Sequence, residues 1–110
     1  MEAKAIARHV RIAPRKVRTI TALITGKAVD EALAVLKFTP NRAAKAVAKV
    51  VASAAANAEH NLELARDALR VRRAYVDSGP SQRRMHARAR GRADVIKKRS
   101  SHITVIVADE

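Results

Sequence analysis

The sequence of 110 residues lacks cysteine and tryptophan, and it has one phenylalanine and one tyrosine. Without cysteine the chain forms neither disulfide bonds nor thiolate metal sites, which fits a cytosolic protein. With so few aromatic rings it has little means of stacking nucleic-acid bases. No apolar run approaches the roughly 20 residues that span a bilayer, and the charged residues near the start are unlike a signal peptide. We therefore expect a cytoplasmic protein without a membrane partner.

Acidic residues are also scarce. The chain has 23 lysines and arginines against 10 aspartates and glutamates, a formal net charge of +13. Charge of this size indicates a polyanionic partner. Arginine outnumbers lysine by 15 to 8, and its planar fork of donors suits phosphates and base edges, so the balance favours nucleic acid. The 24 alanines and 25 isoleucines, leucines and valines are enough for one small core.

The first part of the chain shows the periodicities of a strand followed by a helix. A loose alternation of apolar and charged residues predicts a short strand within residues 3–12. A helix is predicted within residues 13–27, because Pro14 suits its first turn and Gly26 suits its end. One apolar stripe of this helix consists of Val17, Ile20 and Ile24.

Two further helices are predicted next. The shorter one lies within residues 28–38 and has acidic residues in its first turn, where the helix dipole favours them. The longer one covers residues 40–61, with Thr39 as its N-cap and Pro40 in its first turn. Its inward-facing residues are expected to be Val47, Val50, Val51 and Ala54. Residues 61–69 follow as a loop.

The last third contains two predicted strands and a basic segment between them. Alternation predicts a strand at residues 70–77, with Val71, Arg73 and Tyr75 on one face and Arg72, Ala74 and Val76 on the other. A second strand is predicted at residues 102–109. Between them, the segment from Gly79 to His102 has eight lysines and arginines and a single acidic residue, Asp94.

This basic segment is too long for a tight turn, although a hairpin is the simplest link between consecutive strands. Two alternatives remain: a disordered basic loop, or a two-stranded arm reaching about 40 Å at ~3.3 Å per residue. An isolated hairpin is marginal in water. An arm of this composition would therefore need an anionic partner along its length.

The residues that could carry chemistry do not form a catalytic or metal site. The four histidines, His9, His60, His86 and His102, lack metal-ligand spacing. Ser101 and His102 are adjacent strand residues whose side chains point to opposite faces, and no acid is placed to orient the histidine. The segment 25–28, TGKA, lacks the glycine-rich lead of a phosphate-binding loop. We expect no enzyme activity, no metal, no cofactor and no small-molecule substrate.

Four blocks of the sequence, in the same order, match one known family. They are RIAPRKVR (residues 11–18), GKAVDEALAVLKFTPNRAAK (26–45), SAAANAEHN (53–61) and GPSQRRMHARARGRADVIKKRSSHITVIV (79–107). Together they resemble the large ribosomal subunit protein twenty-two family in its bacterial form. The resemblance covers essentially the whole chain, and it rests on the agreement of four separate blocks.

The resemblance implies an α+β fold, with three helices packed on a small three-stranded antiparallel sheet and a long extended β-hairpin arm. It implies one domain over residues 1–110, with a globular core at about 1–72 plus 107–110 and the hairpin at about 73–106.

In function, the resemblance implies a structural constituent of the large ribosomal subunit that binds ribosomal RNA (rRNA) and links several rRNA domains during assembly. The hairpin would line the polypeptide exit tunnel. The implied partners are therefore large-subunit rRNA, neighbouring large-subunit proteins near the tunnel exit and, at the hairpin tip, the nascent polypeptide.

The expected rRNA-binding residues come from the charge pattern and from the resemblance. A strand end and a helix N-terminus, which exposes backbone N–H groups to phosphates, carry the cluster Arg8, Arg11, Arg15, Lys16 and Arg18. The long helix adds Arg42, Lys45 and Lys49 on one outer face. The hairpin adds Arg73, Arg83, Arg84, His86, Arg88, Arg90, Arg92, Lys97, Lys98, Arg99 and His102. The tunnel-lining tip would consist of Met85, His86, Ala87, Arg88, Ala89, Arg90, Gly91 and Arg92.

Two other functions fit a small basic protein. A DNA-compacting architectural protein uses basic β-ribbon arms, usually with an apolar wedge at the tip, for which Met85 is the candidate. A membrane-active cationic protein needs basic helix faces opposite bulky apolar ones, and the alanine-rich long helix fits this poorly.

Overall fold

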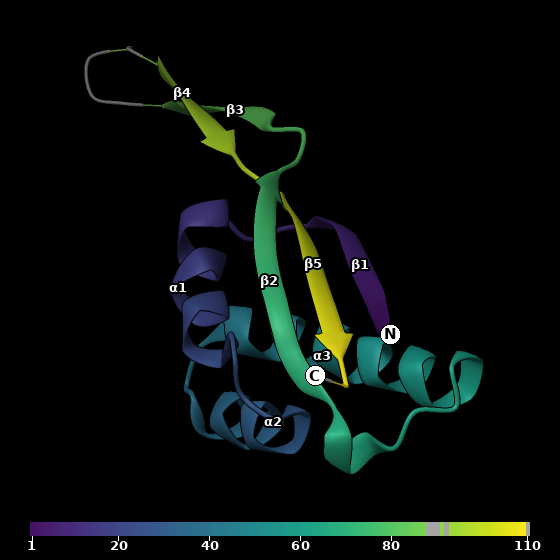
Figure 1. The fold of residues 1–110 in the computed structure, drawn as a ribbon. Coiled ribbons are helices and arrows are strands. Elements are labelled where there is room, and N and C mark those ends of the chain that lie inside the picture. Colours follow the sequence, from purple (N-terminus) through teal and green to yellow (C-terminus); the bar gives the residue numbers. More distant parts are fainter. Residues whose placement is uncertain (88–90, 92, 110) are drawn as a thin grey trace.

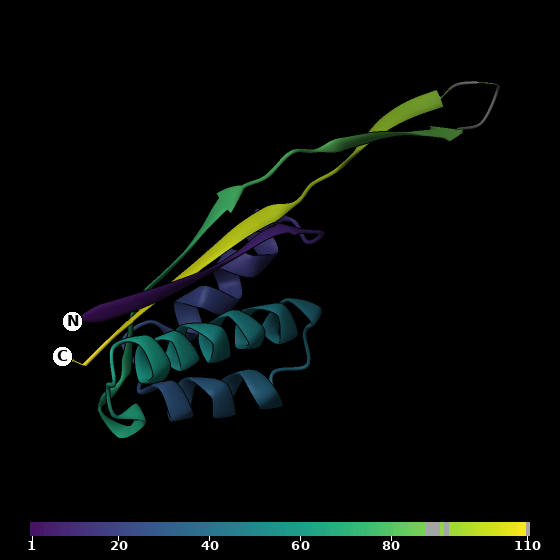
Figure 2. The same ribbon diagram turned by 90° about the vertical axis from the view of Figure 1, so that its right-hand side faces the viewer.

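The computed structural model describes residues 1–87, 91 and 93–109. Three helices cover one face of a three-stranded antiparallel sheet, and a two-stranded ribbon extends from one end of that sheet (Figures 1 and 2). The elements in chain order are β1 (Glu2–Val10), α1 (Pro14–Ile24), α2 (Val29–Phe38), α3 (Arg42–Asn61), the 3-10 turn η1 (Arg66–Ala68), β2 (Arg70–Ser78), β3 (Gln82–Ala87), β4 (Ala93–Lys98) and β5 (Ser101–Ala108). The expected α+β class is confirmed.

The sheet has the strand order β1-β5-β2, so the strand that comes last in the chain lies in the middle. Both neighbours pair with it antiparallel, and Thr104 of β5 lies opposite Ile6 of β1 and Tyr75 of β2. The side chains of β5 that face the helices are fully buried: Ser101, Ile103, Val105 and Val107. The core therefore lies between β5 and the helices.

The helices form where their apolar stripes meet this sheet. Pro14 occupies the first turn of α1, and Gly26 follows its end with a φ of +87°, a left-handed conformation that suits glycine. The α1 stripe and the four expected inward residues of α3 are all buried, which confirms both predictions. No helix in the described part of the chain is long and apolar enough to cross a membrane.

The predicted start of α3 is wrong by two residues. The N-cap is Asn41, whose side-chain oxygen accepts a hydrogen bond from the backbone N–H of Ala43 at 2.9 Å. The Thr39 hydroxyl instead donates to the carbonyl of Val35 at 2.7 Å and so closes the last turn of α2. Pro40 therefore precedes the helix, because the capping side chain comes after it.

The predicted alternation of β2 is also wrong in part. Val71 and Val76 are both buried, although strict alternation places them on opposite faces. The pairing of β2 with β5 shifts register between Val71 and Arg73, so an extra residue interrupts the ladder as a β-bulge does. This shift turns both valines toward the core.

The basic segment forms a two-stranded arm rather than a disordered loop. Strands β3 and β4 pair antiparallel from Gln82 opposite Lys98 to Ala87 opposite Ala93. Residues 73–78 and 101–106 pair within the three-stranded sheet, so the separate ribbon begins beyond them. The radius of gyration is 16.8 Å, against about 13 Å for a compact domain of this length, because the arm projects from the core. The single domain of core plus arm stays a prediction.

The joint between core and arm, defined as His9, Gly79, Ser100, Ser101 and His102, is held by hydrogen bonds. The Gly79 N–H donates to the Ser100 carbonyl at 2.9 Å, and the His9 N–H donates to His102 Nδ1 at 3.1 Å. The Ser100 hydroxyl donates to the carbonyl of residue 80, and the Ser101 hydroxyl to that of residue 12. The base of the arm is therefore fixed against the loop between β1 and α1.

Candidate nucleic-acid interface

An open basic cleft of about 1060 Å³ lies where the arm leaves the core. Its walls come from the loop before α1, the start of α3 and the inner ends of the arm strands. Seven of its lining residues are cationic and none is acidic, and the cations are Arg11, Lys16, Arg42, Arg84, Lys97, Lys98 and Arg99. We call this group the basic cleft. Such a surface can hold a chain of phosphates.

Two helices begin at the basic cleft, and both lack the acidic residues that usually stabilise a helix N-terminus. The first turns of α1 and α3 contain no acidic side chain, whereas the first turn of α2 contains Asp30 and Glu31. Lys16 and Arg42 instead put positive charge beside these ends. A positive charge at its N-terminus lowers the stability of each helix. The arrangement becomes favourable when an anion occupies the cleft.

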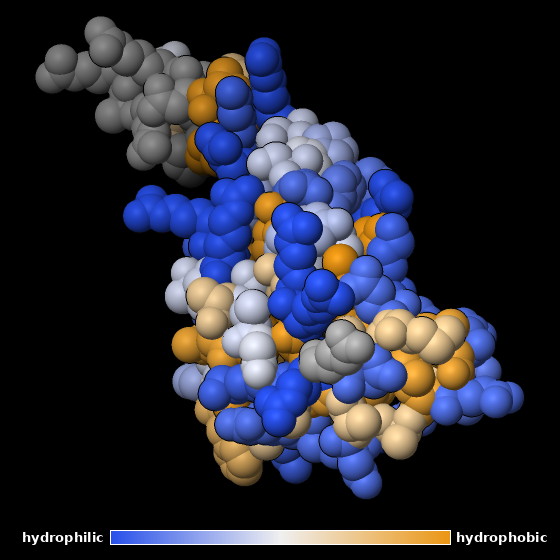
Figure 3. All heavy atoms as spheres, viewed as in Figure 1, coloured by the Kyte–Doolittle hydropathy of each residue, from blue (hydrophilic) through white to orange (hydrophobic). Residues whose placement is uncertain are grey.

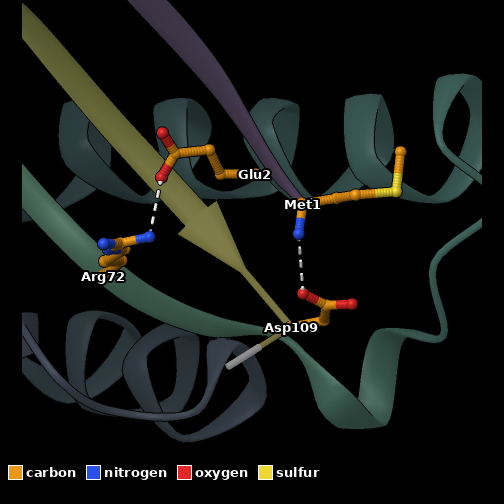
Figure 4. Close-up of polar contacts among 4 residues, drawn as sticks. All are labelled: Met1, Glu2, Arg72 and Asp109. Atoms are coloured by element: carbon orange, nitrogen blue, oxygen red, sulfur yellow. Dashed lines mark hydrogen bonds and ion pairs between the residues drawn. The ribbon is translucent and has the colours of Figure 1, made fainter.

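The described ion pairs lie at the opposite end of the molecule. They are Met1–Asp109 and Arg72–Glu2, both drawn in Figure 4, together with Lys27–Glu31, Arg66–Asp30 and Arg66–Glu59. A hydrogen bond from Arg66 to Asp30 at 2.9 Å is the main cause that raises the pKa of Arg66 above its ordinary value. In the described part of the chain, no ion pair involves a cation of the basic cleft or the arm.

The arm places like charges against one another. Arg83 lies directly opposite Lys97, and Arg84 directs its guanidinium to the side chain of Gln82 at 2.8 Å. Like charges on facing strand residues destabilise a hairpin. Figure 3 shows hydrophilic side chains gathered around the base of the arm. An anion bound along the ribbon would remove this repulsion.

Several other predicted RNA-binding residues are not part of the basic-cleft lining. Arg18 donates to the carbonyl of Val76 at 3.0 Å and so ties α1 to β2, and the Arg73 guanidinium lies 4.9 Å from the ring centre of Tyr75. Arg8 and Arg15 are exposed and do not line the cleft. Arg88, Arg90 and Arg92 of the predicted tip, with Ala89, lie outside the described residues.

Sequence reasoning missed several residues that line the cleft between the cations. They are His9, Ile12, Ala13, Asn41, Ala43, Pro80, Gln82 and Ser100. His9 has a left-handed φ of 57°, and its ring packs edge-on against His102 with centroids 5.0 Å apart. No charge or periodicity marks these positions. Only the folding of three distant segments brings them together.

A second groove, of about 480 Å³, lies between β1 and α3. It carries Lys45 and Lys49 on its rim and shares Arg42 with the basic cleft. Its lining is mainly apolar. The three cations that the sequence grouped on one face of the long helix therefore border two different surfaces.

The described residues contain no group of three potential metal ligands among histidine, cysteine, aspartate and glutamate. The Ser101 hydroxyl is buried and donates to the carbonyl of Ile12. It is therefore engaged in the joint.

The comparisons with known proteins agree on one family. The family described as "Ribosomal protein L22p/L17e" matches residues 5–108. The protein named large ribosomal subunit protein uL22 from Desulforamulus reducens is 60% identical over 110 residues, covering 100% of this chain and 97% of the relative. The protein of the same name from Thermus thermophilus is 58% identical with the same coverage. The chain therefore belongs to the ribosomal protein L22p/L17e family and is a structural constituent of the large ribosomal subunit, not an enzyme.

Proposed function

We propose that the chain binds large-subunit rRNA through the basic cleft and the arm. The observation that carries this proposal is the segregation of charge: the described ion pairs lie at one end, and none of them involves a cation of the cleft or of the described part of the arm. Because the chain belongs to a ribosomal protein family, rRNA is the polyanion that we expect it to bind. Family membership also favours this function over the DNA-compacting and membrane-active alternatives.

Binding would work through electrostatics and shape. Each phosphate neutralised by a lysine or arginine releases counterions, so affinity should fall steeply with salt. Double-stranded RNA presents its backbone and 2′-hydroxyl groups rather than readable base edges. With one phenylalanine, one tyrosine and no tryptophan, the chain has few side chains on which bases can stack. Recognition therefore rests on the path of the RNA backbone.

The resemblance to the family extends this proposal to finer roles. The core and the projecting arm would contact different rRNA segments and hold them together during assembly of the subunit. The arm would then line the polypeptide exit tunnel, with its tip near the nascent chain. Met85 and Ala87 are exposed close to the described end of β3, as such a role requires. As part of the large ribosomal subunit, the protein works in the cytoplasm.

Sedimentation tests the ribosomal assignment. A tagged chain should migrate with the large subunit in a sucrose gradient, before and after a high-salt wash of the lysate. Release into the soluble or nucleoid fractions would contradict the proposal and favour DNA binding.

The basic cleft is tested separately with the isolated chain and large-subunit rRNA over a salt series. Arg11→Glu lies in the cleft, and the matched control Arg70→Glu is an exposed arginine at the opposite end. We expect Arg11→Glu to flatten the plot of log affinity against log salt by about 0.7 to 0.9 for each phosphate that the variant no longer neutralises. Equal effects of the two variants would show that the cleft is not the RNA site.

A further inference from the structure

The groove between β1 and α3 differs in character from the basic cleft. Its floor is apolar, built from Ala5, Ile6, Ala7 and Val10 of β1 and from Ala46 and Val50 of α3. Arg42, Lys45 and Lys49 stand along its α3 side, and no acidic residue lines it. Ile6 is 41% exposed, a large apolar side chain left in contact with water. We call this surface the β1 groove.

One edge of β1 is free at this groove. The strand pairs with β5 on its other side only, and the backbone groups of alternate residues in an antiparallel strand point away from the partner. The Lys4 carbonyl belongs to this outward set, because it accepts a hydrogen bond from the Asn57 side chain at 3.1 Å. Ile6 is in phase with Lys4. Its backbone groups therefore face outward, and among the described residues no hydrogen bond covers them.

We propose that the β1 groove binds an extended, acidic segment of a neighbouring large-subunit protein, which adds a short strand to the edge of β1. Along α3 the groove runs from Arg42 to Ser53, eleven residue steps or about 16 Å at ~1.5 Å per residue. This length accommodates about five extended residues at ~3.3 Å each. Because α3 covers one face of the sheet, the carboxylates of alternate residues would face the α3 cations, and the apolar residues between them would lie beside the exposed Ile6 on the other face.

The other occupants fit the β1 groove less well. An RNA backbone would leave the apolar floor unused and could not pair with a strand edge. A second copy of the chain pairing through β1 would bring two rows of cations together, and this repulsion opposes such a dimer. The inference goes beyond RNA binding by the basic cleft, and neither depends on the other.

The first test uses the full chain in solution with a five-residue probe peptide of alternating valine and glutamate, blocked at both ends. We expect the Ile6 amide to show the largest NMR shift. Lys49→Glu should weaken binding roughly fivefold, since it reverses a charge on the rim. The control Lys37→Glu reverses an exposed lysine of α2 outside the groove and should leave the dissociation constant unchanged. Equal weakening by both variants, or shifts confined to the basic cleft, would overturn the proposal.

The second test uses assembled large subunits. Ser53, an exposed groove residue, is replaced by a photoreactive benzoylphenylalanine, and Leu23 of α1 serves as the control position outside the groove. Light should attach Ser53 to an acidic, extended segment of another subunit protein, which mass spectrometry identifies. A crosslink from Ser53 to RNA, or none at all, would overturn the proposal. Neither outcome bears on the proposal that the basic cleft binds rRNA.

Discussion

Asn41 caps the N-terminus of α3 through its side-chain oxygen atom. Its side chain satisfies the Ala43 N–H, which the helix itself cannot pair. The sequence predicted Thr39 as the cap, because a proline often follows one. The prediction is wrong because the Thr39 hydroxyl is used by the end of α2, which the sequence pattern does not show.

Substitution of Asn41 by alanine should therefore lower the free energy of unfolding by about 1 kcal/mol, the usual cost of removing an N-cap. Thr39→Ala should cost less, because the hydroxyl bonds a carbonyl at a helix end that water can also reach. Urea denaturation of both variants measures the difference. A larger loss for Thr39→Ala would show that the cap assignment is wrong.

The joint requires glycine at position 79 because there is no space for a larger side chain, not because of its backbone conformation. A Cβ at this position would lie 2.5 Å from Ser100 Oγ and 3.2 Å from a ring carbon of His102. The Ser100 hydroxyl cannot turn away freely, because it donates to the Pro80 carbonyl at 2.7 Å.

We expect Gly79→Ala to destabilise the protein by roughly 1–3 kcal/mol through this overlap. Ser100→Ala removes the nearest atom, so the double variant should lose less than the sum of the two single changes. Thermal unfolding of the three variants in a double-mutant cycle gives the coupling. Simple additivity would mean that the joint yields without strain.

At the scale of elements, periodicity predicted the three α-helices and the strands of the sheet, because each apolar stripe or alternation faces the same core, but it did not predict the short 3-10 turn η1 within the expected loop. The exception is the bulge in β2. Val71 and Val76 are both apolar, and the pattern alone does not show where an extra residue enters the ladder. The basic cleft was harder still. Sequence reasoning found its cations but not their convergence, because three distant segments build it.

The arm is an element that should be separable from the core. Strands β3 and β4 pair with each other in a sheet of their own. Replacing residues 82–98 by an Asn-Gly turn should therefore leave the core folded, with a Tm within a few degrees of the full chain. Circular dichroism during heating measures this. Loss of the cooperative transition would show that the core depends on the arm.

At the scale of the whole molecule, the charge is divided between two ends. The described ion pairs lie by the chain termini and η1, and the cations of the cleft and of the described part of the arm take no part in them. The cations gathered at the arm end therefore repel one another. Anions in solution should relieve the repulsion even when RNA is absent.

We therefore expect the Tm of the isolated chain to rise with salt by several degrees, where ~1 kcal/mol corresponds to about 4–8 °C for a domain of this size. The arm-deleted chain should gain less, because it no longer carries many of the repelling charges. Melting curves at low and moderate sodium chloride compare the two. A Tm that falls with salt would mean that the ion pairs dominate instead.

The central position of β5 in the sheet has a consequence for folding during synthesis. Chains are made from the N-terminus, and β1 and β2 do not pair with each other. Until the residues of β5 emerge, both have an unfilled side, and the helices have no complete surface on which to pack. The three-stranded sheet therefore forms only after β5 has been made. Until then the incomplete basic chain is accessible to any polyanion that it meets.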